Sequence, residues 1–287
     1  MTADLHLFDA LAWRMAQPQP GLRQGAHRGR MRGAGGAFAD LAPLLAYPDA
    51  RRLDLRRSLT DPMGGFFVRR FERPADITLH VLVDASASLG AGALSDRQGL
   101  AALMAGGLAQ AARRGGDRAA VQAVGGNEIL AALPPSRRAG IGQQARDLIA
   151  ALIPTGSGVG GLIAAASSLP RRRVLVAVIS DFDISAPELA LLLEALSPRP
   201  VLPIWLRDSG LEEPPGDFGL AEIRDPETGR RRTLLTSGRW AARQAQASLR
   251  HRQSLRAVFA GQGLRPVEIR DSIDIGDLIA TLDEAPL

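Results

Sequence analysis

From residue 76 onward, short apolar runs alternate with stretches of helical periodicity. Ile77–Val83 and Val174–Ile179 are apolar almost throughout, which is typical of strands buried on both faces of a sheet. The expected strands cover residues 77–84, 118–124, 128–133 (an edge strand), 174–179, 201–206 and 266–270, and the expected helices cover 96–114, 141–152, 162–169, 187–196, 239–261 and a last one from about 275. This alternation predicts a doubly wound α/β fold, a three-layer sandwich with a mainly parallel sheet.

The residues before this pattern are interpreted as an N-terminal extension, residues 1–75, that packs on a main domain of residues 76–287. A short amphipathic helix is expected at its start. Residues 16–36 are rich in Gly, Pro, Gln and Arg and have no apolar period, so they are expected to form an extended loop. Phe66–Phe71 alternates enough to predict a strand, and its three phenylalanines are expected to lie in a core.

Hydropathy gives no sign of a membrane span. No window approaches the roughly 18 consecutive apolar residues that a transmembrane helix needs. Asp4 and Asp9 stand where a signal peptide would carry positive charge. A cytoplasmic location is therefore expected.

Two residue types are missing, and each absence excludes whole classes of chemistry. Without cysteine there are no disulfides, thiolate nucleophiles or cysteine zinc sites. All 35 basic residues are arginine, so there is no P-loop lysine, Schiff base or Ser–Lys dyad. An ATPase that this protein serves would have to be a separate chain.

The net charge of +5 does not by itself indicate a nucleic-acid partner. The arginines form short clusters along the whole chain, and only 4% of residues are aromatic, whereas nucleic-acid binding favours a focused basic surface with stacking rings. Between Asp49 and Arg57, acidic and basic residues alternate, which favours intramolecular ion pairs. A basic nucleic-acid-binding protein is kept as an alternative to a protein-docking surface.

Oxygen-bearing side chains follow two of the expected strands. Asp84 ends the first strand, and Ser86 and Ser88 follow at alternate positions, so that one carboxylate and two hydroxyls can converge. Asp181 follows the strand at Val174–Ile179. In parallel sheets ligands collect at the carboxyl ends of strands, and Mg²⁺ prefers such oxygen donors. The competing interpretation is that these residues only cap the next helix.

The motif Asp84-x-Ser86-x-Ser88 resembles the first loop of the metal-ion-dependent adhesion site of von Willebrand factor A domains. Most of the chain resembles one bacterial branch of these proteins, encoded beside MoxR-type AAA+ ATPases. The resemblance rests on HRGRMRGAGGAFADLAPL, YPDARRLDLRRSL, FFVRRFERP, GGDRAAV, ISDFDIS and RDPETG, which occur in this order.

The resemblance implies a ligand set for Mg²⁺ or another divalent cation. Asp84, Ser86 and Ser88 would hold the metal, and Asp181 would do so directly or through water. A threonine loop that usually completes such sites aligns with residues 155–161.

In that loop the chain departs from the family pattern. The threonine position falls on Gly158 and the acidic position on Val159. Either Thr155 or Ser157 supplies the oxygen from a neighbouring position, or the site is weakened or lost.

The resemblance also implies a function without catalysis. Related proteins are adaptors that work with a MoxR-type ATPase in the maturation or assembly of a client protein, and one group accompanies methanol oxidation. Mg²⁺ with an open coordination position would accept a carboxylate from the partner.

Enzymatic alternatives find less support. Gly156-x-Gly158-x-x-Gly161 matches the dinucleotide-binding fingerprint, and Asp181 lies at the expected distance after it. The fingerprint requires a preceding strand, however, and residues 141–153 have helical periodicity. A nucleotide-binding (NAD-type) enzyme is kept as an alternative. None of the four histidines pairs locally with a nucleophile in the way that a catalytic triad requires, so no catalytic residue is proposed.

Overall fold

A computed structural model describes Leu5, Phe8 and residues 37–46, 48–72, 77–214, 216–224, 226, 229–274 and 276–278. The chain divides into two compact units, residues 23–76 and residues 1–22 together with 77–287. The extension expected over residues 1–75 is thus divided between them. The expected N-terminal helix and the loop at 16–36 lie outside the described residues, as does most of the helix expected from residue 275.

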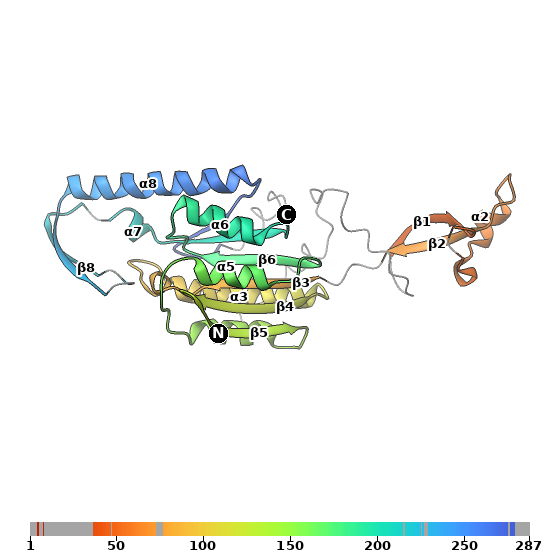
Figure 1. Cartoon of the computed structure of the whole chain (residues 1–287), viewed down its shortest axis with the longest axis horizontal. Coiled ribbons are helices and arrows are strands. Elements are labelled where there is room, and N and C mark those ends of the chain that lie inside the picture. Colours follow the sequence, from red (N-terminus) through yellow and green to blue (C-terminus); the bar gives the residue numbers. More distant parts are fainter. Residues whose placement is uncertain are drawn as a thin grey trace. The chain divides into compact units, whose positions relative to one another are not determined.

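The smaller unit is built on a β-hairpin that the sequence predicted only in part. Strand β1 (Ala37–Pro43) pairs antiparallel with β2 (Phe67–Glu72), and the short helices η2 (Ala50–Arg52) and α2 (Leu55–Leu59) lie between them in sequence (Figure 1). Only β2 was expected.

Charged residues hold this smaller unit together. Asp54 caps α2 by accepting the N–H of Arg57 at 3.0 Å, and the same carboxylate pairs with Arg69 at 2.7 Å. Within residues 49–57, Arg52 pairs with Asp49 at 3.3 Å, which confirms the expectation of intramolecular ion pairs. The expected core position of Phe66 is wrong, because its side chain is 59% exposed. Phe66 precedes the strand, where no neighbouring strand covers it.

The main unit contains a six-stranded sheet with strand order β10-β7-β6-β3-β4-β5. Its strands are β3 (Thr78–Asp84), β4 (Arg118–Gly125), β5 (Glu128–Ser136), β6 (Val174–Ser180), β7 (Val201–Arg207) and β10 (Val267–Arg270). All neighbours are parallel except β5, which pairs antiparallel with β4 at one edge. Every strand expected from the sequence is present, and the predicted fold class is confirmed.

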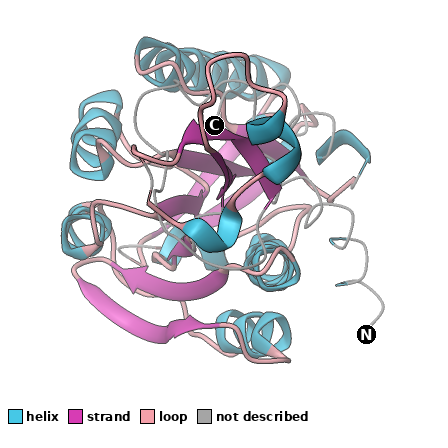
Figure 2. Cartoon of the chain, turned by 90° about the vertical axis from the view of Figure 1, so that its right-hand side faces the viewer, coloured by secondary structure: helices cyan, strands magenta, loops and turns pink. Residues whose placement is uncertain are grey.

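Helices cover both faces of this sheet (Figures 1 and 2). One face packs against α3 (Arg97–Arg114) and α4 (Ile141–Ala150), and the other against α5 (Gly160–Ser168), α6 (Ala186–Leu196) and α8 (Gly238–Gly261). Alternation within the strands explains this arrangement. In β3, Val81 and Val83 face the α3 side, whereas Leu82 faces the other side.

The first residues of the chain contribute to the main core. Leu5 and Phe8 are buried, and the side chain of Gln110 in α3 donates to the carbonyl of Leu5 at 3.2 Å. Gly107 makes room for Phe8, because a Cβ atom at this position would lie 2.4 Å from the phenyl ring. A glycine that weakens the interior of a helix is therefore explained by close packing.

Three further elements extend the main unit between β7 and α8. The short helix α7 (Ser209–Glu212) follows β7, and β8 (Gly219–Arg224) pairs antiparallel with β9 (Arg231–Thr236). The two strands form a hairpin on either side of residues 225–230. Among the described helices, none combines the length and the apolar character that crossing a membrane requires.

Arg199 binds the ends of two helices near the edge of the sheet where β6 and β7 begin. Its buried guanidinium donates to four carbonyl oxygens, those of Leu169 and Pro170 just after α5 and those of Ala195 and Leu196 in the last turn of α6. Positive charge at helix C-termini complements the helix dipoles and satisfies carbonyl groups that have no partner within the helix.

Candidate metal centre

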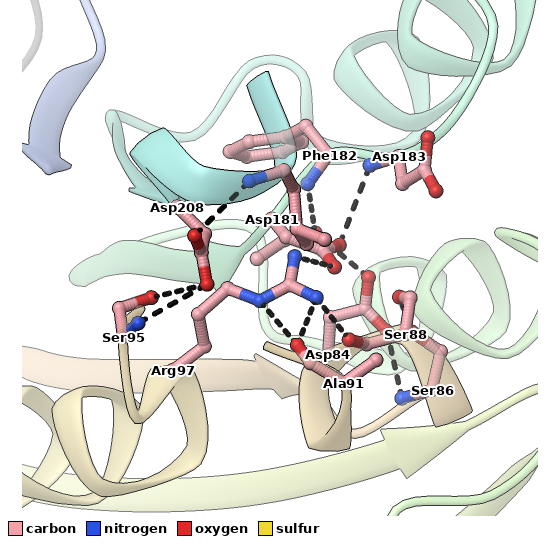
Figure 3. Close-up of polar contacts among 12 residues, drawn as sticks. Asp84, Ser86, Ser88, Ala91, Ser95, Arg97, Asp181, Phe182, Asp183 and Asp208 are labelled. Atoms are coloured by element: carbon pink, nitrogen blue, oxygen red, sulfur yellow. Dashed lines mark hydrogen bonds and ion pairs between the residues drawn. The ribbon is translucent and has the colours of Figure 1, made fainter. Parts of the chain in front are cut away.

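Strand order brings the two expected oxygen-bearing loops together. β3 and β6 are parallel neighbours, and Val83 lies opposite Ile179. Asp84 and Asp181 therefore leave the sheet side by side at its carboxyl edge, with Ser86 and Ser88 (Figure 3). We call Asp84, Ser86, Ser88 and Asp181 the oxygen cluster. All four residues are buried.

Asp84 is held from two directions. One carboxylate oxygen accepts the N–H of Ser86 at 3.1 Å, and the other accepts the hydroxyl of Ser180 at 2.7 Å. The hydroxyls of Ser86 and Ser88 lie 3.0 Å apart, within hydrogen-bonding distance. The side chain of Ser88 also hydrogen-bonds Asp181. The three residues of the motif therefore converge on one point.

Asp181 is oriented by the backbone that follows β6. Its carbonyl accepts the indole N–H of Trp205 at 2.8 Å, and Phe182 adopts a left-handed conformation with φ of 46°. This conformation is unfavourable for a bulky residue, so the surroundings must impose it. Phe182 is fully buried and packs edge-on against Trp205 and Phe259, with ring centroids 6.1 and 5.4 Å away.

The turn at Phe182 directs the side chains of Asp181 and Asp183 to different sides. The side chain of Asp181 points into the oxygen cluster, whereas that of Asp183 points away (Figure 3) and is exposed. Burial of the phenyl ring thus fixes which of the two carboxylates enters the cluster.

Arg97 is a member of this site that sequence reasoning missed. It is the first residue of α3, and its guanidinium donates to a carboxylate oxygen of Asp181 at 2.8 Å and to the carbonyls of Ser88 and Ala91. Both charged side chains are almost fully buried, with exposures of 8% and 3%. A signal was present, because a basic residue in the first turn of a helix opposes the helix dipole and needs a compensating partner.

Burial makes the negative charge of the cluster costly. It raises the pKa of Asp84 to about 6, assisted by repulsion from Asp181. Burial also raises the pKa of Asp181, although Arg97 and the hydrogen bond from Ser88 oppose this change. A bound cation would offset the cost for both carboxylates.

The residues of the oxygen cluster fit a hard divalent cation. Each carboxylate oxygen retains lone pairs beyond its present hydrogen bonds, and the two hydroxyls can also serve as ligands. Within the described ranges, no three acidic or histidine side chains gather at one point. Mg²⁺ would therefore depend on hydroxyls and retained water as well as on carboxylates.

The glycine-rich loop lies beside the cluster without joining it through its side chains. The N–H of Thr155 donates to the carbonyl of Ala85 at 2.9 Å, and the carbonyl of Gly156 accepts the N–H of Ala87 at 3.0 Å. Thr155 and Ser157 are exposed. Backbone contacts thus place Thr155 and Gly156 next to the cluster, and neither Thr155 nor Ser157 buries its side chain there.

Packing explains the glycines of this loop. Gly156 has a φ of 81°, and a Cβ atom there would lie 2.8 Å from the N atom of Gly126. The preceding element is α4, as the sequence predicted, so the strand that a dinucleotide-binding fingerprint requires is not there.

The side chain of Asp208 holds the loop that leads into α3. No pattern in the sequence predicted this role. Its buried carboxylate accepts the N–H groups of Ala93 and Ser95 at 2.7 and 3.1 Å. It also accepts N–H groups of Leu94, Gly210 and Leu211 and the hydroxyl of Ser95. Burial opposes its ionisation, but these donors together lower the pKa of Asp208 to about 2.

Replacement of Asp84 by asparagine is expected to stabilise the metal-free protein. The pKa of Asp84 in the folded state, about 6, exceeds the usual 3.8, so ionisation disfavours folding. The penalty is absent below the unfolded pKa, grows as pH rises to that of the folded state, and then stays constant. At about pH 8 the free energy of unfolding should rise by about 2–3 kcal/mol, measured by urea unfolding.

The matched control is Asp183→Asn, which removes an exposed carboxylate near the same turn. Its stability should change by less than about 0.5 kcal/mol. A loss of stability in Asp84→Asn at high pH would contradict the electrostatic account of this site.

Comparisons with known proteins identify a family for this chain and a relative that is described by its genetic neighbourhood. The chain is 62% identical over 105 residues to a protein of Paracoccus denitrificans described as "Uncharacterized protein in moxR 3'region", a match that covers 36% of this chain and 99% of the relative. No solved structure matches the chain. Residues 48–255 match the family described as "Protein of unknown function DUF58", and the chain belongs to this family.

Proposed function

We propose that this chain is a non-enzymatic adaptor that binds a partner protein through a divalent cation, and that it works with a separate MoxR-type AAA+ ATPase. The ATPase would remodel or assemble a client protein in the cytoplasm, where ATP is available. A methanol-oxidation system is one candidate client. The von Willebrand A-like resemblance of the oxygen cluster motivates the cation dependence.

One observation carries this proposal, the meeting of two carboxylates and two hydroxyls at adjacent strand ends. Asp84 and Asp181 come from sequence positions almost a hundred residues apart, and their burial raises the pKa of both. Buried negative charge with spare lone pairs is typical of a cation site rather than of a structural cap.

The partner is inferred from the genetic neighbourhood of the relative. That protein is described by its place in the moxR 3' region. Bacterial genes that lie together often encode proteins that act together, and this chain has no lysine with which to build a P-loop of its own. A separate ATPase would supply the energy from ATP.

Charge explains how the cation would recruit the partner. Asp84, Asp181 and Arg97 together carry one net negative charge when both carboxylates are ionised. A divalent cation changes this to one net positive charge. An aspartate or glutamate of the partner would then complete the coordination shell and neutralise the site.

The test is binding to a purified MoxR-type ATPase from the same organism, measured by titration calorimetry in Mg²⁺ and after chelation. Both chelation and Asp84→Ala should weaken binding by at least about 10-fold, because the partner's carboxylate would lose its cation. Asp147→Asn, which alters an exposed carboxylate on α4, is the control and should bind as the wild type does.

Two results would count against the proposal in different ways. Binding that ignores both chelation and Asp84→Ala would contradict the cation mechanism. No binding to the ATPase in the presence of Mg²⁺ would contradict the adaptor function.

A further inference from the structure

Arg97 places a fixed positive charge inside the proposed cation site. Its guanidinium spans three acceptors, the carboxylate of Asp181 and the carbonyls of Ser88 and Ala91 (Figure 3). The Nε–H also donates to the carbonyl of Ala91, at 2.9 Å. The side chain is therefore held at several atoms and cannot leave the site without breaking these bonds.

Burial makes this arrangement electrostatically strong. The Arg97 side chain is 8% exposed and that of Asp181 is 3% exposed, so water screens their attraction weakly. A guanidinium cannot give up its proton in a protein, so Arg97 keeps its positive charge beside Asp181. Asp181 is thus neutralised before any metal ion arrives.

Among the residues that the structure describes, none gives Asp84 such a counter-charge. Its carboxylate accepts hydrogen bonds from the N–H of Ser86 and the hydroxyl of Ser180, which are both neutral donors. The two carboxylates of the cluster are therefore unequal. One is paired with a guanidinium, and the other retains a full negative charge for an added cation.

We propose that Arg97 is a built-in counter-cation that neutralises Asp181 and so leaves Asp84, with the hydroxyls of Ser86 and Ser88, to hold the divalent ion. This inference rests on the proposed function, because it concerns the same site. It adds to that function a reason why the site alone would hold the ion weakly. The cluster contributes only one net negative charge, so a carboxylate from the partner is needed for tight binding.

Net charge in the cluster should then set the affinity for the ion. Mn²⁺ serves as the probe, and its binding is followed at about pH 8 by electron paramagnetic resonance of the free ion. The wild type has one net negative charge, Arg97→Met has two, and Asp181→Asn has none. The double variant returns to one.

The expected order of affinity follows from these charges. Arg97→Met should bind Mn²⁺ at least about 10-fold more tightly than the wild type, and Asp181→Asn at least about 10-fold more weakly. The double variant should return to within about 3-fold of the wild type. Arg97→Lys, which keeps the charge but cannot span the three acceptors, should also stay within about 3-fold.

A purely structural role for Arg97 predicts a different order. Loss of its hydrogen bonds would loosen the Ser88–Ala91 loop, and both Arg97→Met and Arg97→Lys would bind Mn²⁺ more weakly. That result would overturn the inference while leaving the proposed function intact. The Asp181→Asn variant is an independent test, because an affinity for Mn²⁺ equal to that of the wild type would also overturn the inference.

Two further outcomes would count against the proposed function as well. If Arg97→Met binds Mn²⁺ and the wild type does not, Arg97 itself serves as the cation of the site, which overturns the inference that Asp84 holds a divalent ion beside Arg97 and also contradicts cation-dependent partner binding. If neither the wild type nor any variant binds Mn²⁺ at millimolar concentration, the result contradicts both the inference and the proposed function.

Discussion

Replacement of Arg199 by methionine is expected to lower the free energy of unfolding by about 3–4 kcal/mol. The substitution keeps an unbranched side chain of similar length but removes the guanidinium that donates to Leu169, Pro170, Ala195 and Leu196. These carbonyls lie at the C-terminal ends of α5 and α6. In the variant the carbonyl of Leu196 would keep the backbone N–H of residue 199, but those of Leu169, Pro170 and Ala195 would lose the guanidinium, and each such loss costs about 1 kcal/mol or more.

Urea unfolding followed by circular dichroism would measure this loss. Arg172→Met is the matched control, because Arg172 is exposed in the loop that precedes β6. Its free energy of unfolding should change by less than about 0.5 kcal/mol. Equal stabilities for the two variants would show that Arg199 does not hold the two helix ends.

Replacement of Asp208 by asparagine is expected to cost about 2–4 kcal/mol and to loosen the loop between Ala91 and Ser95. The shape of the side chain is preserved, but an amide group replaces one of the two oxygens that accept backbone N–H groups. The donors that converge on this carboxylate lie in the loop before α3 and in α7, two segments far apart in the sequence. No other side chain of the same size would satisfy all of them.

The effect of Asp208 depends on pH in a defined direction. The pKa of its carboxyl is about 2 in the folded protein, below the usual 3.8, so ionisation stabilises the fold. This contribution is complete above the unfolded pKa and is lost as pH falls through that of the folded state. The difference in stability between the wild type and Asp208→Asn should therefore shrink between about pH 4 and pH 2.

Asp96→Asn is the control for this comparison. Asp96 caps α3 by accepting the N–H of Gly99 at 2.8 Å, and asparagine is an equally good cap. Its stability should stay within about 0.5 kcal/mol of the wild type. A difference between wild type and Asp208→Asn that stayed constant down to pH 2 would contradict the low pKa of Asp208.

Local pattern in the sequence was sufficient for most of the fold. Apolar runs gave the six strands of the main sheet, because each is buried on both faces or lies at an edge with a clear alternation. Strand β1 was missed because Ala37–Pro43 is rich in alanine and lacks the β-branched residues that are typical of strands. Phe66 was placed in a core because hydrophobicity alone does not indicate whether a neighbouring strand covers a residue.

The candidate site was predictable only in part. Asp84, Ser86 and Ser88 are adjacent in sequence, so their convergence follows from local geometry, and the strand end before Asp181 was visible as well. Arg97 was missed because its partner lies 84 residues away. Asp208 was missed for the same reason, since Ala93 is 115 residues distant.

The sequence alone determined the alternation of strands and helices, the chemistry that is excluded without lysine and cysteine, and the oxygen-bearing residues at two strand ends. Each of these depends on composition or on residues close together in the chain. Only the tertiary structure decided that β3 lies beside β6, that Arg97 neutralises Asp181 and that Asp208 holds the loop before α3. These contacts join distant segments, and the order of strands in the sheet, which local patterns do not encode, brings them together.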